Sequence, residues 1–483
     1  MTTHRLVASQ TIDRPLEEVF EFFAQPENLG RITPASMSFE QVSTDLDMRS
    51  GLQIEHRIRP LLGIPMTWRS TIEAFDRPRS FVDVQASGPY RRWRHHHRFT
   101  TVPGGTRIDD DVEYELPLGP LGDVAHALVI REQLREIFRH RARTIEAIFT
   151  RPEPNPSPRT VGVAGGTGFV GGAIALELFR RGHRVVVLSH RGATARGPLP
   201  DAVELRTVDV GDGAGLPEAL HGLDALAIAL AFRNSPIEVP RRGQTFEAVD
   251  AGGTERLVSA ARQAGVGRLF YVSGAGAAPD AARHWFRAKW RAEAAVSKSG
   301  LPFTIVRPTW IYGPRDVSLN RFVGFARRMP AVPLTNTGRQ LLAPVFIDDV
   351  ARLAADSLVS DTAIDQVFEL GGPETLPMRE IVRRALRAAG LSRPILPGPT
   401  PLIKLAAAPL QLLPEPPLTP DAVDFINQPA TVDIGPLLRR MPRRLTPLDE
   451  GLATYLPPAS GPGHIVIDAP ARRRERPRPV RVE

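Results

Sequence analysis

The sequence predicts an α/β protein in which a doubly wound parallel sheet occupies residues 160–458 and a smaller α+β domain precedes it. Three observations carry this prediction. A glycine-rich turn, VGVAGGTGFVG at residues 161–171, joins a short apolar strand to an apolar helical run. Strand-like and helix-like runs then alternate, which is typical of a parallel sheet covered on both faces. Before residue 151, strand-like runs instead follow one another and end in one long helix.

Composition limits the class of protein. A chain of 483 residues is long enough for two or three domains, and it has no cysteine, which excludes disulfides, thiol nucleophiles and cysteine-bound metals. The first ten residues lack the apolar core of a signal peptide, and no run reaches the roughly 18 to 20 apolar residues of a membrane span. We therefore expect a soluble, cytoplasmic protein.

Half of the net charge of +8 lies at the C-terminus, where residues 472–483 hold six arginines and two glutamates. The Pro- and Arg-rich composition predicts a disordered basic tail over 459–483, with an anionic-surface tether as the alternative and no specific nucleic-acid partner. The apolar run 402–413 is too short to span a bilayer. We expect internal packing for it, with peripheral membrane contact as the alternative. The sequence does not indicate an oligomeric state.

Residues 1–150 are expected to form one domain. His4–Ile12 alternates like a strand, and a helix follows from Pro15. Six further strands are predicted at Ser38–Ser43, Leu52–Arg59, Met66–Phe75, Ser80–Ala86, Arg92–Thr101 and Thr106–Glu115. A long helix closes the domain from about Val124 to Phe149, so a sheet wrapped around this helix would leave a cavity between them.

A period of two along the sixth of these strands places four side chains on one face, and we expect them to line that cavity. They are Trp93, His95, His97 and Phe99. Histidines two apart can ligate a metal or hydrogen-bond a ligand. No third ligand is evident, although Asp109–Asp111 on the neighbouring strand stay open. We therefore expect no metal site, and for the two histidines we favour ordinary burial over contact with a ligand in the cavity.

Proline at almost every other position of residues 151–159, RPEPNPSPR, excludes helix and sheet and predicts a stiff linker. From Thr160 onward the alternating pattern begins, with helices expected at Phe246–Ala264 and Arg283–Lys298 among others. The predicted strands are Val161–Ala164, Arg184–Leu188, Val203–Asp209, Ala225–Ala231, Arg268–Val272 and Phe303–Arg307.

The glycine turn has the composition of a dinucleotide pyrophosphate cradle. Glycine has no Cβ where backbone must approach phosphate, and a helix N-terminus presents free N–H groups. The cradle would use Gly165, Gly168, Phe169, Val170 and Gly171. A purely structural turn is the alternative.

The specificity for the nucleotide depends on the end of the second strand, where NAD sites usually place a carboxylate. Here the positions are Ser189, His190 and Arg191. A hydroxyl and a guanidinium suit a 2′-phosphate, so we expect NADP(H) over NAD(H), which the same site could also accept. We expect Asp209 and Val210 to contact the edge of the adenine ring. We expect Ala229 and Ala231, whose side chains are small, to form a wall close to the cofactor.

The first domain resembles the START-like polyketide cyclase/dehydrase superfamily, which has the helix-grip fold. The matching segments are RPLEEVFEFFAQPENLGRITP at 14–34, FVDVQASGPYRRWRHHHRF at 81–99 and GGTRIDDDVEYELPLGP at 104–120. Together they cover nearly all of residues 1–150. The resemblance implies that an apolar or aromatic small molecule binds inside the grip, and it does not imply catalysis.

Residues 160–455 resemble the extended and atypical short-chain dehydrogenase/reductases, which have a Rossmann sheet and a small C-terminal substrate region. The matching motifs are AGGTGFVG (164–171), QTFEAVDAGGTERLVSAARQAGVGRLFYVSGAG (244–276), RPTWIYGP (307–314), PVFIDDVARL (344–353) and FELGGPETL (368–376). Among these proteins the chain is most similar to the branch related to the nucleotide-binding accessory subunit of respiratory complex I.

This resemblance implies a catalytic serine, tyrosine and lysine. Ser273 and Lys289 occupy the serine and lysine positions, and the lysine would also hold the nicotinamide ribose. The tyrosine position holds Trp285, whose indole N–H has no acid–base chemistry near neutral pH. Asp250 stands where the family commonly has asparagine, which also puts the proton-relay water in doubt. Three other residues are considered as substitutes for the missing tyrosine: Tyr271, Tyr312 and His284.

Two functions stay open. One is an NADP(H)-dependent oxidoreductase or epimerase acting on an apolar molecule held with help of the first domain. The other is a non-catalytic sensor or assembly factor that binds a nucleotide and a lipid- or quinone-like ligand.

Overall fold

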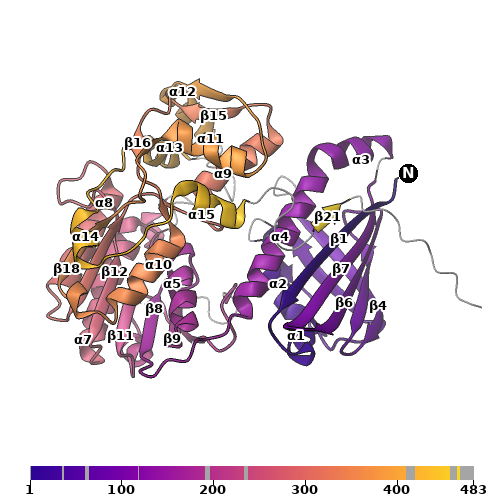
Figure 1. Cartoon of the computed structure of the whole chain (residues 1–483), viewed down its shortest axis with the longest axis horizontal. Helices are drawn as coiled ribbons and strands as arrows, with labels where there is room; N and C mark the ends of the chain where they lie inside the picture. Colours follow the sequence, from indigo (N-terminus) through magenta and orange to yellow (C-terminus); the bar gives the residue numbers. More distant parts are fainter. Residues whose placement is uncertain are drawn as a thin grey trace, which may run out of the picture. The chain divides into compact units, whose positions relative to one another are not determined.

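The computed structural model describes residues 2–34, 37–59, 65–117, 119–190, 196–232, 238–409, 419–456 and 465–467. It divides into two units (Figure 1). The first unit comprises residues up to 149 together with the segment at 465–467, and the second comprises residues 150–459. In the part of the chain so described, no helix combines the length and the apolar composition needed to cross a membrane.

The first unit is an antiparallel sheet in the order β2-β3-β4-β5-β6-β7-β1-β21, packed on a long helix (Figure 1). Its strands are β1 (His4–Ile12), β2 (Glu40–Gln41), β3 (Gln53–Ile58), β4 (Met66–Asp76), β5 (Ser80–Ser87), β6 (Arg92–Val102), β7 (Gly105–Glu115) and β21 (Ile465–Ile467). Its helical segments are α1 (Leu16–Phe23), a 3-10 turn (Pro26–Asn28), α2 (Leu29–Ile32), α3 (Pro120–Ala125), a π turn (His126–Ile130) and α4 (Arg131–Ile148). The predicted α+β helix-grip arrangement is confirmed.

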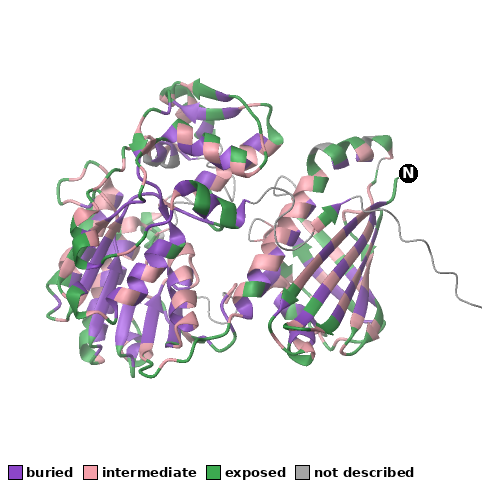
Figure 2. Ribbon diagram, in the orientation of Figure 1, coloured by how far each residue is buried: buried purple, intermediate pink, exposed green. Residues whose placement is uncertain are grey.

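Alternation along the strands explains why the sheet packs on α4. In β6 and β7 every second side chain is buried, as the purple bands in Figure 2 show. The buried side chains of α4, including Leu134, Phe138 and Ile145, meet this face. The predicted helix from Val124 to Phe149 is continuous in sequence, although the structure divides it into α3, the π turn and α4.

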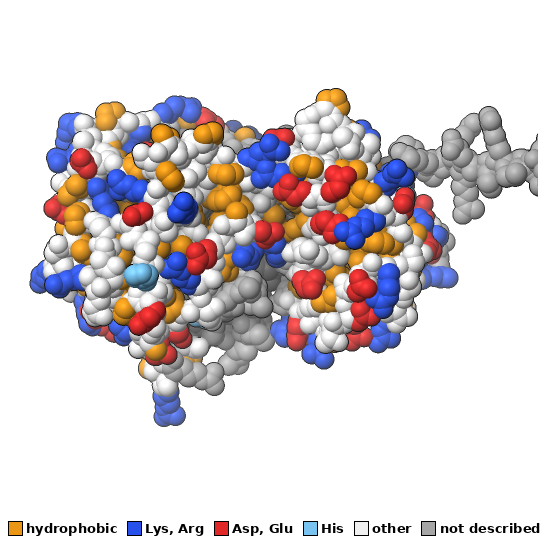
Figure 3. Space-filling model, turned by 90° about the horizontal axis from the view of Figure 1, so that it is seen from below, with side chains coloured by type: hydrophobic (Ala, Val, Ile, Leu, Met, Phe, Trp, Pro, Cys, Tyr) orange, Lys and Arg blue, Asp and Glu red, His pale blue; other side chains and the backbone are white. Residues whose placement is uncertain are grey.

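The prediction of a disordered tail from residue 459 is wrong for β21. Ile465–Ile467 pair antiparallel with Leu6–Ala8 at the edge of the sheet. Ile467 is buried beside Leu6 and Val112, because the short alternation in IVI turns an apolar side chain toward the core. The arginines of residues 472–483 lie outside the described residues. On the face drawn in Figure 3, described Lys and Arg side chains are interspersed with Asp and Glu.

The linker contains neither helix nor strand, as its prolines predict, but it does not run freely. The backbone N–H of Glu153 donates to the carbonyl of Arg180 at 2.7 Å, and the Asn155 side-chain amide donates to the carbonyl of Arg181 at 2.8 Å. Gly182 allows this approach, because a Cβ there would lie 2.2 Å from the Glu153 carbonyl oxygen. The linker is therefore attached to the second unit.

The second unit is built on a seven-stranded parallel sheet in the order β10-β9-β8-β11-β12-β13-β18. Its strands are β8 (Thr160–Ala164), β9 (Arg184–Ser189), β10 (Glu204–Thr207), β11 (Ala225–Ile228), β12 (Arg268–Val272), β13 (Phe303–Pro308) and β18 (Gln366–Leu370). The predicted doubly wound Rossmann sheet is confirmed. Strands β10 and β11 end earlier than predicted, so Asp209, Ala229 and Ala231 lie in loops.

Helices cover both faces of this sheet (Figure 1). One face packs against α5 (Phe169–Arg180), α10 (Ile347–Ser357) and α14 (Gly435–Arg440). The other packs against α6 (Leu216–Leu220), α7 (Gly253–Gln263) and α8 (His284–Ser297), with a π turn at Glu247–Gly252 before α7. Because the strands are buried on both sides, they are nearly all apolar rather than alternating.

The predicted small C-terminal region has its own apolar core. It contains β14 (Ile311–Tyr312), α9 (Val317–Arg328), β15 (Val332–Thr335), β16 (Leu341–Leu342), β17 (Val345–Phe346), β19 (Leu376–Pro377), α11 (Met378–Ala388), β20 (Ile395–Gly398), α12 (Thr400–Ala407), α13 (Pro420–Asn427) and α15 (Leu448–Tyr455). The apolar run 402–413 is packed less than expected, because Leu402 and Leu405 of α12 are exposed. Residues 410–413 of that run lie outside the described residues.

Candidate functional site

The glycine turn between β8 and α5 brings backbone segments closer than any side chain allows. Gly165 has a φ of +79°, and a Cβ on it would lie 2.5 Å from the carbonyl oxygen of Ala229. A Cβ on Gly171 would lie 2.2 Å from the carbonyl oxygen of Gly165. The N–H of Gly168 closes the turn by donating to the same Gly165 oxygen at 2.9 Å. The turn therefore requires glycine at these positions.

Helix α5 starts directly at this turn. Gly168 is its N-cap, and the hydrogen-bond ladder begins with the N–H of Gly172 donating to the carbonyl of Gly168 at 3.1 Å. The N–H groups of the first three helical residues, 169–171, have no acceptor within the helix. Together with the helix dipole they favour an anion. A dinucleotide pyrophosphate fits this cradle, and the predicted phosphate residues are all brought together here.

Arg315 is a member of the site that sequence reasoning missed. It follows β14, and its guanidinium donates to the carbonyls of Thr167 and Gly168, each at 3.2 Å. A positive charge is thereby held over the start of α5 from a position about 145 residues further along the chain. The signal was a lone arginine directly after the RPTWIYGP motif, which has no meaning until the fold places it.

The end of β9 carries no carboxylate in the described residues. Ser189 is the last residue of the strand and is buried, and His190 is exposed. Arg191, the third predicted residue, lies outside the described part of the chain. Asp209 is exposed and accepts the N–H of Gly211 at 2.7 Å, so its carboxylate closes a local turn. The Val210 carbonyl accepts the Arg256 side chain at 2.7 Å.

Of the two small residues after β11, Ala229 lies beside the glycine turn. The N–H of Ala229 donates to the carbonyl of Ala164 at 3.0 Å, and its own carbonyl is the group that excludes a side chain from Gly165. Ala231 is exposed in the loop that follows.

Lys289 is held by a buried ion pair. Its Nζ lies 2.9 Å from Oδ1 of Asp250 and donates to the carbonyl of Leu230 at 2.7 Å. The other Asp250 oxygen accepts the backbone N–H of Phe232 at 2.7 Å. Burial alone would lower the pKa of Lys289, but Asp250 and Tyr271 raise it above its ordinary value. The residue that departs from the family asparagine is therefore the partner of the predicted lysine.

Ser273 and Trp285 are both buried. The Ser273 backbone N–H donates to the carbonyl of Val306 at 2.8 Å, which fixes the residue just beyond β12. Neither its hydroxyl nor the indole N–H of Trp285 has a hydrogen-bond partner among the described residues. The Trp285 ring centroid lies 6.1 Å from that of Phe246 and 5.1 Å from that of His284.

The three residues considered as substitutes for the missing tyrosine differ in their surroundings, and Tyr271 is the one that lies beside Lys289. Tyr271 is fully buried, its ring centroid is 5.4 Å from the Lys289 Nζ, and burial raises its pKa. Tyr312 is also fully buried and donates to the carbonyls of Pro447 and Leu448, and burial raises its pKa as well. His284 faces away to Glu238, with its Nε2 3.3 Å from Oε2.

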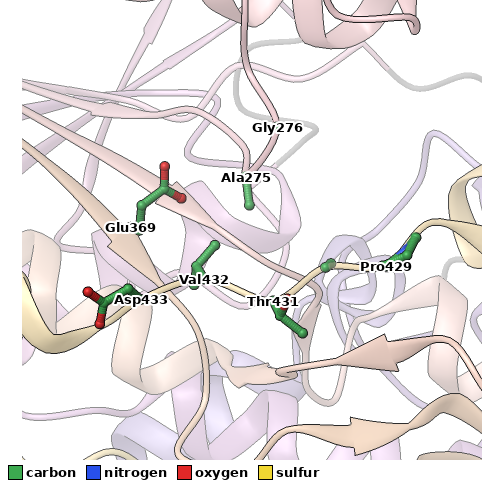
Figure 4. A pocket seen from close by; sticks show the side chains of 8 residues that line it. Ala275, Gly276, Glu369, Pro429, Thr431, Val432 and Asp433 are labelled. Atoms are coloured by element: carbon green, nitrogen blue, oxygen red, sulfur yellow. The ribbon is translucent and has the colours of Figure 1, made fainter.

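A pocket of about 410 Å³ opens two residues beyond Ser273 (Figure 4). It lies at the C-terminal ends of β12 and β18, where ligands bind in open α/β sheets. Burial raises the pKa of Glu369, and Arg307 at 3.3 Å opposes this. The lining residues are Ala275, Gly276, Glu369, Pro429, Ala430, Thr431, Val432 and Asp433. Sequence reasoning missed this pocket, because residues 429–433 join it only through the fold.

The four predicted cavity residues of the first unit do share its inner face, and all four are buried. They are packed, however. Trp93 contacts Trp68 at a ring separation of 5.3 Å, and Phe99 contacts Phe20 at 5.3 Å. The cavity found nearby measures about 20 Å³, the space of a single water. It is lined in part by Asp110, Phe138 and Arg141.

His95 and His97 belong instead to a buried charge cluster, which consists of Asp83, His95, His97, Asp110 and Arg141. His95 Nε2 lies 2.9 Å from Oδ1 of Asp110, and His97 Nε2 lies 3.1 Å from Oδ2 of Asp83. Burial lowers the pKa of His95 to about 4. Burial alone would raise the pKa of Asp110, but Arg141 and the histidines hold it well below its ordinary value.

Comparison with known proteins supports both halves of this description. Residues 165–327 match the NAD(P)H-binding family, and residues 3–148 match the polyketide cyclase/dehydrase and lipid transport family. The chain is 30% identical over 238 residues to the (4-alkanoyl-5-oxo-2,5-dihydrofuran-3-yl)methyl phosphate reductase of Streptomyces griseus, covering 47% of this chain and 73% of the reductase.

It is also 28% identical over 227 residues to the mitochondrial NADH dehydrogenase (ubiquinone) 1 alpha subcomplex subunit 9 of Arabidopsis thaliana, covering 45% of this chain and 55% of that subunit. The chain thus spans little more than half the length of this relative. The crystal structure of gox2253 has the same fold, with a TM-score of 0.50 and 23% identity over 62% of this chain and 97% of its own. The chain belongs to the NAD(P)H-binding family with a Rossmann sheet, and its N-terminal residues 3–148 match the polyketide cyclase/dehydrase and lipid transport family.

Proposed function

We propose that the second unit binds NADP(H) and retains it as a ligand, rather than using it for rapid reduction of a carbonyl compound. The observation that carries the proposal is Trp285 at the position of the family's proton-donating tyrosine. An indole N–H cannot give up its proton near neutral pH, and a missing general acid removes about 10² to 10⁴ of the rate.

The ion pair of Lys289 supports the same proposal. In a reductase of this family the lysine lowers the pKa of the tyrosine and holds the nicotinamide ribose. Here Asp250 neutralises the ammonium, and the Leu230 carbonyl takes a further hydrogen bond. Bound NADPH would supply a hydride at this site. The chain supplies the Ser273 hydroxyl and a charged lysine, but no group at residue 285 that releases a proton.

Two measurements on the native full-length chain test whether NADP(H) is retained as a ligand. Fluorescence titration gives the affinity for NADPH, and single-turnover absorbance at the nicotinamide band gives the rate of its oxidation by quinones and by β-keto carbonyl compounds. We expect tight binding and an oxidation rate that Ser273→Ala leaves unchanged. Multiple turnovers that Ser273→Ala abolishes would overturn the proposal.

Preference for NADP(H) is supported by Ser189 and His190, which leave no carboxylate beside the expected 2′-phosphate. Replacing Ser189 by aspartate should weaken NADPH binding about ten- to a hundredfold through charge repulsion and should strengthen NADH binding. Ser189→Ala is the matched control, because it removes the hydroxyl without adding charge. Tighter binding of NADH than NADPH by the native chain would contradict this prediction.

A second candidate is an NADP(H)-dependent oxidoreductase that acts on an apolar small molecule held with the help of the first unit. Two observations favour it: the Ser273 hydroxyl is unpartnered among the described residues, and a pocket of about 410 Å³ is lined by Ala275 and Gly276, which follow Ser273 closely in the chain. The similarity to a phosphate-ester reductase of Streptomyces griseus is compatible with it. The single-turnover experiment with Ser273→Ala distinguishes the two.

A further inference from the structure

Three potential metal ligands converge on the inner face of the first unit. Asp83 of β5 is the direct cross-strand partner of His95 of β6, and His97 follows two residues later on the same face. Oδ2 of Asp83 lies 3.1 Å from Nε2 of His97 and 3.7 Å from Nδ1 of His95. The ligand atoms of the three residues all lie within 4.8 Å of one another. Ligands about 2.0 to 2.2 Å from a tetrahedral ion are roughly 3.3 to 3.6 Å apart, so little movement would be needed.

Asp110 is placed to orient both imidazoles from behind. Its Oδ1 lies 2.9 Å from Nε2 of His95 and 2.8 Å from Nδ1 of His97. These are the ring nitrogens opposite to those that face Asp83. A metal-bound histidine usually donates its other N–H to such a carboxylate, which fixes its tautomer and direction. Arg141 lies beside both groups, because its Nη2 is 3.4 Å from the same Asp110 oxygen and 3.3 Å from Nδ1 of His97.

The charge of this cluster also favours a cation. The carboxylates of Asp83 and Asp110 outnumber the single guanidinium of Arg141, and the side chains of all three are at most 18% exposed. An uncompensated buried charge is costly, and a bound cation removes that cost. We propose that Asp83, His95 and His97 bind one divalent first-row transition-metal ion, such as zinc, in the first unit.

Three protein ligands leave a coordination position open, as in metal sites that bind a further ligand. The histidine side chains are 6% exposed and that of Asp83 is 18% exposed, so the ion and any fourth ligand would enter beside Asp83. The nearby rings are apolar: Phe81 stacks on His97 at 4.2 Å, and Trp93 lies 6.2 Å from His95. The open position would therefore take water or an oxygen atom of an otherwise apolar molecule.

The test is a titration of the chelator-treated, tag-free full chain with Co²⁺, followed by its visible absorption. We expect one equivalent of Co²⁺ to bind and to give the visible absorption band of a low-symmetry Co²⁺ site. Asp83→Asn and His97→Gln should weaken binding at least about a hundredfold, and Asp110→Asn about ten- to a hundredfold. His96→Gln is the matched control, since His96 points to the opposite face of β6 and should leave the affinity unchanged.

Thermal denaturation and circular dichroism report whether the first unit of each variant is folded, and nucleotide binding reports that the second unit is unaffected. If a variant does not fold, X-ray absorption of the native Zn²⁺-loaded chain is measured in place of that variant's titration. The spectrum should show two imidazole nitrogens and at least one oxygen bound to the zinc. Absence of one-equivalent binding, equal affinities in the native chain and Asp83→Asn, or an all-oxygen shell would overturn the proposal.

Discussion

Replacing Trp285 by tyrosine, together with Asp250→Asn, should raise the single-turnover rate of NADPH oxidation by about a hundredfold over the native chain. Tyrosine restores a group that can pass a proton, and general acids contribute about 10² to 10⁴ in rate. The single change Trp285→Tyr should give a smaller gain. In that variant Asp250 still neutralises Lys289, so the lysine cannot fully lower the pKa of the new phenol.

Asparagine is the right replacement at position 250 for a structural reason. Its amide oxygen can still accept the backbone N–H of Phe232, as Asp250 does at 2.7 Å, while the negative charge is removed. Lys289 lies four residues after position 285, on the same side of α8, so its freed ammonium can approach the new tyrosine. The rate is measured by stopped-flow absorbance with enzyme in excess over NADPH.

Trp290→Tyr is the matched control for this gain. Trp290 lies on the same helix and is exposed, with its ring 5.9 Å from the Arg307 guanidinium, away from Asp250 and Lys289. The control should leave the oxidation rate unchanged. If the double variant binds NADPH normally and shows no faster oxidation, position 285 does not face the acceptor, and the case for a retained ligand loses its main support.

Gly171→Ala should reduce NADPH affinity by at least about a hundredfold and lower the melting temperature. The added Cβ would lie 2.2 Å from the Gly165 carbonyl oxygen and 2.9 Å from the Gly166 nitrogen, and both are backbone atoms that cannot rotate away. The turn must therefore open, which moves the first N–H groups of α5 from the pyrophosphate position. Isothermal calorimetry gives the affinity, and differential scanning calorimetry gives the melting temperature.

Gly324→Ala is the control, because it makes the same change in α9 of the same unit. There the nearest atom to the new Cβ is a guanidinium nitrogen of Arg328 at 3.5 Å, an ordinary contact with a flexible side chain. Alanine in a helix interior is favoured over glycine by about 1 kcal/mol, so this variant should be at least as stable as the native chain. An equal loss of affinity in both variants would contradict the role assigned to the turn.

The local sequence pattern was sufficient to predict many of the strands and helices and the glycine turn expected to hold phosphate. β1 and β12 begin and end where alternation and apolar runs predict, and the glycine spacing identified the turn without any structure. The shared inner face of Trp93 and His95 also followed from a period of two. These features depend on residues close in sequence, because backbone geometry and hydrophobic periodicity act over a few residues.

Position 285 illustrates the difference between what the sequence shows and what only the tertiary structure shows. A tryptophan in place of a tyrosine is visible in the sequence, and so is the acidic residue at position 250. That these two departures concern one lysine became visible only when Asp250 Oδ1 was found 2.9 Å from Lys289 Nζ. The same holds for Arg315, which contacts the glycine turn although it lies about 145 residues further along the chain.

The sequence by itself therefore determined the two-domain α/β architecture, the glycine turn between strand and helix, and the presence of tryptophan at position 285. Tertiary structure alone decided the ion pair of Lys289, the pocket formed by residues 429–433, the pairing of β21 with β1, and Asp83 as the third group beside the two histidines. The physical reason is that charge neutralisation, strand pairing and ligand geometry depend on distances between atoms of residues far apart in the chain. Folding sets those distances through the packing of the whole unit, and no local pattern records them.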